Sequence, residues 1–176
     1  LDEKTLDFSV KVGNVIVATG FSEFEPLGIH GYGQYANVVT QSKLARMMDP
    51  SGPTNGRIQR LSDGKKPSRI AMIQCVGSRD KNHAYCSKIC CMIALKHARS
   101  IKKENPEVEV TICYTDIRLA GKEYEAYYNE CKSIGVRFVR GEVEKVVEDS
   151  NKNLTIHVGR ASGEVVTVAA DLLILS

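Results

Sequence analysis

The chain has 176 residues, of which 43% are hydrophobic and 26% are charged, so it has the composition of a globular protein that can bury one core. Its formal net charge of +3 comes from Lys and Arg residues spread along the chain, and we expect no nucleic-acid partner. No apolar run reaches the roughly 18 residues that cross a bilayer, and the N-terminus is not a signal peptide. These features predict a cytoplasmic protein with no membrane partner, whose first residue is a cut edge.

The first third of the chain is predicted to be mostly loop. Residues 14–18 form a β-rich apolar run that leads to Gly20, which is typical of a buried strand entering a tight loop. Residues 21–67 are rich in Gly, Pro, Asn and Ser, with one helix predicted over 41–48 and Thr40 or Ser42 as its cap. Such a long irregular stretch predicts a linker or a surface that packs against something else.

From residue 68 onward, predicted strands alternate with predicted helices. The strands are expected over 70–76, 108–114, 136–140 and 172–175, the helices over 85–103 and 124–134, and a hairpin over 142–148 and 153–158. This order predicts an α/β fold: a Rossmann-like, doubly wound parallel sheet with an added β-hairpin, preceded by a loop-rich segment. We therefore divide the chain into a loop-rich part, residues 1–67, and a Rossmann-like domain, residues 68–176.

Four of the six cysteines lie close together in the pattern C-x10-C-x3-C-C. Cys75 ends a predicted strand, and Cys86, Cys90 and Cys91 fall in the first turns of the following helix. Soft thiolate ligands select zinc or iron–sulfur clusters. Adjacent cysteines fit the tetrahedron of a structural zinc ion poorly, whereas a [4Fe–4S] cluster accepts wider and less regular spacing. The spacing thus favours a [4Fe–4S] cluster, with the four thiolates as ligands and no catalytic residue among them.

Three other interpretations stay open at this point. The cysteines could bind structural zinc, or they could be buried hydrophobic side chains, as we expect for the isolated Cys113 and Cys131. A third interpretation is an NAD(P)H-binding domain with structural cysteines, in which Asp116 would contact the ribose. However, residues 74–80 contain one glycine where a dinucleotide site needs G-x-G-x-x-G.

Several segments resemble the A subunit of heterodisulfide reductase. The resemblance is carried by Ile73–Asp80, Tyr85–Met92 and Thr115–Arg118, and upstream by Gly31–Tyr35, Gly52–Thr54 and Ser62–Lys65. It covers nearly the whole chain. The cysteine block is its most specific part.

The resemblance implies an interior segment of a large cytoplasmic iron–sulfur flavoprotein with a thioredoxin-reductase-like core. Residues 1–67 would be the end of one half of the FAD domain followed by a loop-rich linker, and residues 68–176 would be the equivalent of the nicotinamide domain, carrying the cysteines. Cys75, Cys86, Cys90 and Cys91 would bind a [4Fe–4S] cluster that exchanges electrons with the FAD of the full-length protein, where Thr19 and Gly20 would approach the flavin nucleotide. The expected partners are the remainder of the same polypeptide and other heterodisulfide-reductase-type subunits. We expect the segment alone neither to hold FAD nor to be an active oxidoreductase.

Overall fold

The structure is a computed structural model that describes residues 5–176. It contains a parallel sheet in the strand order β1-β8-β2-β3-β4 and an antiparallel sheet in the order β5-β6-β7. The strands of the parallel sheet are β1 (Val38–Thr40), β2 (Arg69–Ile73), β3 (Glu109–Tyr114), β4 (Arg137–Arg140) and β8 (Leu172–Leu175). The antiparallel strands are β5 (Glu142–Glu148), β6 (Leu154–Gly159) and β7 (Val165–Ala170), and the helices are η1 (Ile29–Gly31), α1 (Gln41–Met48), α2 (Cys90–Glu104) and α3 (Tyr124–Ser133).

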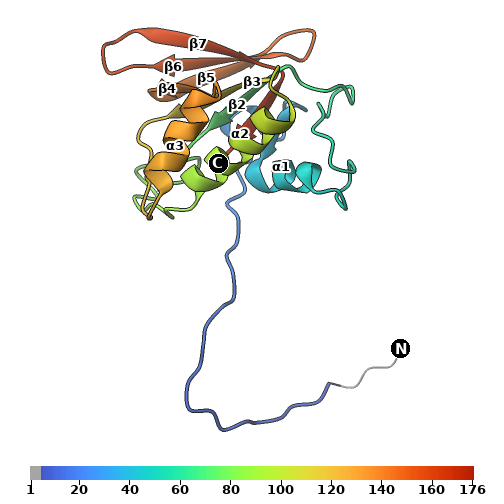
Figure 1. Ribbon diagram of the computed structural model, residues 1–176, viewed down its shortest axis with the longest axis vertical. Helices are drawn as coiled ribbons and strands as arrows, with labels where there is room; N and C mark the ends of the chain where they lie inside the picture. The colour runs from blue at the N-terminus through green and yellow to red at the C-terminus, as the bar shows by residue number, and fades with distance from the viewer. Residues whose placement is uncertain (1–4) are drawn as a thin grey trace.

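The parallel sheet is buried on both faces, and the side-chain alternation of β2 shows how. Ile70 and Met72 point into a core shared with α1, α2 and α3. Ala71 and Ile73 point into a second core shared with the antiparallel sheet. Because successive side chains of a strand point to opposite faces, a buried parallel strand reads as a continuous apolar run. Figure 1 shows the three helices on one side and β5, β6 and β7 on the other.

The α/β fold with a parallel sheet is confirmed. The second face is covered by the antiparallel strands, where a doubly wound sheet would place helices. β5 and β6 pair as the predicted hairpin, and β7 adds a third strand to it that was not predicted. β1 was also not predicted, because a strand of three residues gives too short a pattern to recognise.

The helix predicted over 41–48 has those bounds, and the Thr40 side chain caps it by accepting a hydrogen bond from the amide of Lys43 at 3.4 Å. The prediction that the next helix begins at residue 85 is wrong. α2 begins at Cys90 because Lys88 has a φ of 59°, a left-handed conformation that a right-handed helix cannot contain. Cys86 therefore lies in a loop and not in the helix.

The strand predicted over residues 14–18 does not form. Val15, Ile16 and Val17 are 79%, 89% and 80% exposed, in an extended segment that runs away from the folded body (Figure 1). An apolar run forms a stable strand only with a neighbour to pair with, and no strand described here pairs with it. The division of the chain at residue 67 stays a prediction, although β1 and α1 share the sheet and core of the later residues.

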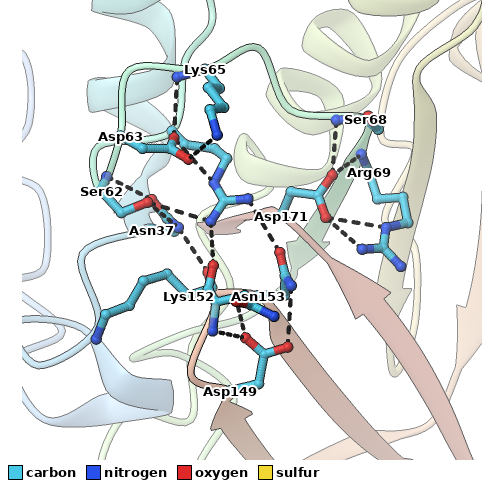
Figure 2. Close-up of polar contacts among 12 residues, drawn as sticks. Asn37, Ser62, Asp63, Lys65, Ser68, Arg69, Asp149, Lys152, Asn153 and Asp171 are labelled. Carbon is cyan, nitrogen blue, oxygen red and sulfur yellow. Dashed lines mark hydrogen bonds and ion pairs between the residues drawn. The ribbon is translucent and has the colours of Figure 1, made fainter.

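The amino ends of the parallel strands are held by buried polar contacts. Asp171, which is 6% exposed, precedes β8 and accepts hydrogen bonds from the backbone amides of Ser68 and Arg69 at 2.9 and 3.0 Å. It also accepts two from the guanidinium of Arg69, at 3.1 and 2.6 Å (Figure 2). Burial alone would raise the pKa of Asp171, but these donors outweigh it, and the pKa lies below its usual value.

A second set of contacts joins β1 to the turn between β5 and β6. The side-chain amide of Asn37, which is fully buried, donates to Ser62 Oγ at 3.0 Å and to the carbonyl of Lys152 at 2.8 Å. Its side-chain oxygen accepts from the amide of Ser62 at 3.0 Å, and Asp149 closes the turn by accepting from the amide of Asn153 at 2.9 Å (Figure 2). Polar side chains thus close the amino edge of the sheet.

We predict that Asp171→Asn lowers the free energy of unfolding by about 2–4 kcal/mol, because it leaves Arg69 without its buried charged partner. The contribution of Asp171 to the free energy of unfolding should be fully present above the unfolded-state pKa of about 3.9. It should be lost as the pH falls through the lower folded-state pKa. Urea unfolding of both proteins from pH 7 to pH 3 measures this.

Glu164→Gln is the matched control, since Glu164 is 60% exposed in its ion pair with Arg160. It should change the stability at pH 7 by less than about 1 kcal/mol. Equal stability of Asp171→Asn and the unmodified protein at pH 7 would show that Asp171 does not anchor the sheet.

Candidate metal centre

The carboxyl edge of the parallel sheet carries the cysteines. Cys75 lies two residues after the end of β2 and adopts a φ of 65°, a left-handed conformation that bends the chain at this point. The loop that starts there leads through Cys86 to α2. Ligands of open α/β sheets bind outside the carboxyl ends of the strands. The cysteines are at the expected edge.

Cys90 and Cys91 occupy the first turn of α2. Backbone amides in a first helical turn have no partner within the helix, and the helix dipole adds partial positive charge there, so this position favours thiolates. Cys91 is 3% exposed, whereas Cys75, Cys86 and Cys90 are half-buried. The amide of Lys88 donates to Cys86 Sγ at 3.4 Å, which places a further donor among the sulfur atoms.

Neighbouring thiols in this group affect one another's ionisation. A hydrogen bond from Cys91 and another from the Ser87 hydroxyl help to lower the pKa of Cys90 to about 6, and the same thiol pair raises the pKa of Cys91. Burial raises the pKa of Cys75, and the charges of Cys90 and Cys86 raise it further. One of the four is thus ionised near neutral pH and acts against ionisation of its neighbours.

Arg79 provides positive charge on the other side of Cys75. Its Nη1 atom lies 4.0 Å from Cys75 Sγ, and its Nη2 atom lies 3.6 Å from Asp116 Oδ2. Asp116 also accepts from Arg118 Nε at 2.7 Å. A hydrogen bond from the backbone of Arg118 acts on Cys91 and lowers its pKa, against the larger opposing effect of Cys90. The loop after β3 therefore contacts the cysteine group at two points.

The residues fit a thiolate-bound metal centre in donor chemistry and in surrounding charge. Within residues 5–176, no three His, Cys, Asp or Glu side chains converge closely enough to hold one metal ion. The segment that joins Cys75 to Cys90 contains no helix or strand, so its backbone can adjust around a bound group. Four thiols on this segment and the adjoining helix turn are the donor set that an iron–sulfur cluster requires.

Cys113 and Cys131 lie apart from this group, in the two cores. They are 1% and 0% exposed, and burial raises their pKa values to about 12 and about 11. This confirms that they are core thiols. His83 lies 3.7 Å from Asp80 and stacks edge-on with Phe24 and Tyr85.

Thr19 and Gly20 are not brought to the cysteines. Both are exposed in the extended N-terminal segment, and a Cβ at Gly20 would meet no atom within 4 Å. Their role as flavin contacts stays a prediction.

Two features of the site could not be found by sequence reasoning. A pocket of about 520 Å³ opens beside Cys90, with Phe24, Ile93 and Leu175 among its apolar walls. At its polar end, Gln41 Nε2 donates to Ser176 Oγ at 2.7 Å. These residues come from four separate segments, and no local pattern links them.

The loop after β2 differs from a dinucleotide-binding turn. Its one glycine, Gly77, has a φ of 74°, and a Cβ there would collide with the ring of Phe24. The ring of Phe24 therefore lies directly against this turn. Asp116 is in ion pairs with Arg79 and Arg118, where a ribose-binding acid would face a hydroxyl group.

Fold and site together define a Rossmann-like α/β module that carries a cysteine group where nucleotide-binding members carry a glycine-rich turn. No family model matches the chain. It is 48% identical over 184 residues to the first of the iron-sulfur A subunits of CoB–CoM heterodisulfide reductase in Methanopyrus kandleri, an alignment that covers 99% of this chain and 28% of that protein.

Other relatives carry similar names. The chain is 47% identical over 182 residues to the A subunit of the H(2)/formate:CoB-CoM heterodisulfide,ferredoxin reductase of Methanococcus maripaludis, and 48% identical over 182 residues to the iron-sulfur A subunit of the CoB–CoM heterodisulfide reductase of Methanocaldococcus jannaschii. Each alignment covers 99% of this chain, which spans 28% of the length of these relatives. The resemblance to the A subunit of heterodisulfide reductase is confirmed, and the chain is homologous to a part of that protein. No helix within residues 5–176 is long and apolar enough to cross a membrane.

We predict that a thiol-alkylating reagent modifies Cys86 and Cys90 in the folded, metal-free protein at least ten times faster than Cys113 and Cys131. The reason is access, since the first two are half-buried and the last two are enclosed in the cores. Peptide mapping by mass spectrometry after timed quenching measures each rate. Cys86, Cys90, Cys113 and Cys131 should all react at similar rates in 8 M urea. Equal rates in the folded protein would contradict the burial described here.

Proposed function

We propose that this chain is an electron-transfer module in which Cys75, Cys86, Cys90 and Cys91 bind a [4Fe–4S] cluster. The observation that carries the proposal is that these four cysteines lie on one loop and the adjoining first turn of α2 at the carboxyl edge of the sheet, with the guanidinium of Arg79 4.0 Å from Cys75 Sγ. The names of two relatives, which include the words "iron-sulfur subunit", support the same assignment.

A cluster bound there would supply one-electron transfer. The protein contributes the surroundings. Cys91 is enclosed by the core beneath α2, which limits water on that side. The unpaired amides of the helix start and the charge of Arg79 offset the negative charge of four thiolates. Cys75 lies two residues beyond the central strand β2, which is paired on both sides up to Ile73.

In the whole protein the cluster would exchange electrons with FAD. The apolar pocket beside Cys90 supports this, because it offers space for a planar ring next to a ligand sulfur. Thr19 and Gly20 would contact the flavin nucleotide, and residues 1–67 would connect the module to the flavin domain. The partners would be the remainder of a cytoplasmic flavoprotein and the other subunits of a heterodisulfide-reductase-type complex. The subunit designation of the relatives supports such an assembly.

The proposal is tested by measuring the iron and acid-labile sulfide content per chain after anaerobic reconstitution. We expect about four of each, with visible absorption that bleaches on reduction by dithionite. Replacing any one of Cys75, Cys86, Cys90 or Cys91 by Ala should lower the iron content at least severalfold.

Cys113→Ala and Cys131→Ala are the matched controls and should keep the full iron content, since these thiols lie in the cores. Full iron content in all four single-site variants would refute the ligand assignment. Retention of one colourless zinc ion would favour a structural zinc module. Saturable NADH binding without iron would favour a nucleotide-binding domain.

A further inference from the structure

The loop after β2 and the loop after β3 are joined through one guanidinium group. Arg79 reaches Cys75 Sγ with Nη1 at 4.0 Å and Asp116 Oδ2 with Nη2 at 3.6 Å. Its side chain is 24% exposed, so the group is partly removed from water. A charge in such a position acts more strongly on its neighbours than one in bulk solvent.

The backbone also fixes this contact. Arg79 has a φ of 60°, and its amide donates to the carbonyl of Tyr85 at 3.2 Å, which ties the two sides of the cysteine loop together. A non-glycine residue in the left-handed region costs about 1–2 kcal/mol. Such strain persists where the surrounding structure imposes it, and it is concentrated at functional sites. Here it directs the guanidinium toward Cys75.

Asp116 sets the orientation of Arg79 from the other side. The carboxylate also pairs with Arg118 Nε at 2.7 Å, just beyond the carboxyl end of β3. Arg79, Asp116 and Arg118 together carry one net positive charge. If Arg79 were released from Asp116, its long side chain could turn into solvent, away from the sulfur.

We infer that Arg79 donates to the Cys75 sulfur of the bound cluster and raises its reduction potential, and that Asp116 is the residue that positions Arg79. The inference rests on the proposed cluster. Reduction adds one electron to the cluster, and a cation that donates to a ligand sulfur stabilises the reduced form more than the oxidised form. Neither residue is a ligand, so we expect variants at both positions to assemble the cluster.

The experiment is a redox titration of the anaerobically reconstituted full chain, followed by visible absorption and by electron paramagnetic resonance. We expect Arg79→Gln to keep its iron and to lower the reduction equilibrium constant at least tenfold, which is 59 mV for a one-electron couple. Arg79→Lys should recover part of that loss, because it restores the charge without the planar fork. Arg99→Gln is the control, because it also removes one positive charge from the protein. Arg99 pairs with Glu130 on α3, and this variant should leave the potential unchanged.

The double variant separates positioning from simple charge. Asp116→Asn removes a negative charge, which acting through space alone would raise the potential in any background. If Asp116 positions Arg79, Asp116→Asn alone lowers the reduction potential. Adding Asp116→Asn to Arg79→Gln then lowers it no further, because the guanidinium is already absent. A rise in both backgrounds would overturn the role of Asp116.

The outcomes also separate this inference from the proposed function. Unmodified chain that takes up no iron would overturn both. Iron bound with an unchanged potential in Arg79→Gln would overturn this inference alone. If Arg79→Gln fails to assemble a cluster, the potentials of Arg79→Lys and Asp116→Asn decide the matter, and unchanged values in both would overturn the inference.

Discussion

The position of β2 between β8 and β3 is the constraint on which the rest of the structure depends. Its pairs run in register from Arg69 to Ile73 on the β3 side and from Ile70 to Ile73 on the β8 side. Alternate side chains enter two different cores, so a slip of one residue would exchange the two faces. The end of β2 at Ile73 is therefore fixed in space. Cys75 follows two residues later.

The two edges of the parallel sheet differ: the amino edge is closed by structural contacts, and the carboxyl edge carries the candidate site. At the amino edge, Asp171 and Asn37 satisfy buried donors and join distant segments, and these contacts leave little polar capacity for a ligand. At the carboxyl edge the chain leaves the strands in loops, with thiols, an arginine and an open pocket. Rigid support at one edge allows an adaptable loop at the other. This is the usual relation between a scaffold and a functional loop.

Much of the fold could be predicted from the sequence because the strands have strong local patterns. Leu172–Leu175 is a short continuous apolar run, and it forms a strand buried on both faces. The failures have physical causes. Residues 14–18 have the composition of a strand, but a strand needs a neighbour, and composition does not show one. The early start assigned to α2 followed the apolar spacing from residue 85, which does not reveal a left-handed backbone at Lys88.

The cysteine ligands of the candidate site could be predicted from the sequence, whereas the residues around them could not. Cysteine is rare enough that four within Cys75–Cys91 indicate a shared task, and the turn after β2 is where α/β sheets bind ligands. The contact of Arg79 with Cys75 lies within four residues of sequence, but it depends on the backbone angles of both. The role of Asp116 and the pocket walls depend on tertiary packing, because their parts come from different loops.

The strain in the cysteine loop is itself an argument for function. Cys75, Arg79 and Lys88 all have left-handed backbone conformations, with φ values of 65°, 60° and 59°. Glycine would adopt each of them without cost, whereas these residues each lose about 1–2 kcal/mol. Cys75 brings a thiol, Arg79 brings a guanidinium 4.0 Å from that sulfur atom, and the backbone amide of Lys88 donates to Cys86 Sγ. A glycine at position 75 or 79 would supply neither the thiol nor the guanidinium, so the strain at these two positions points to function.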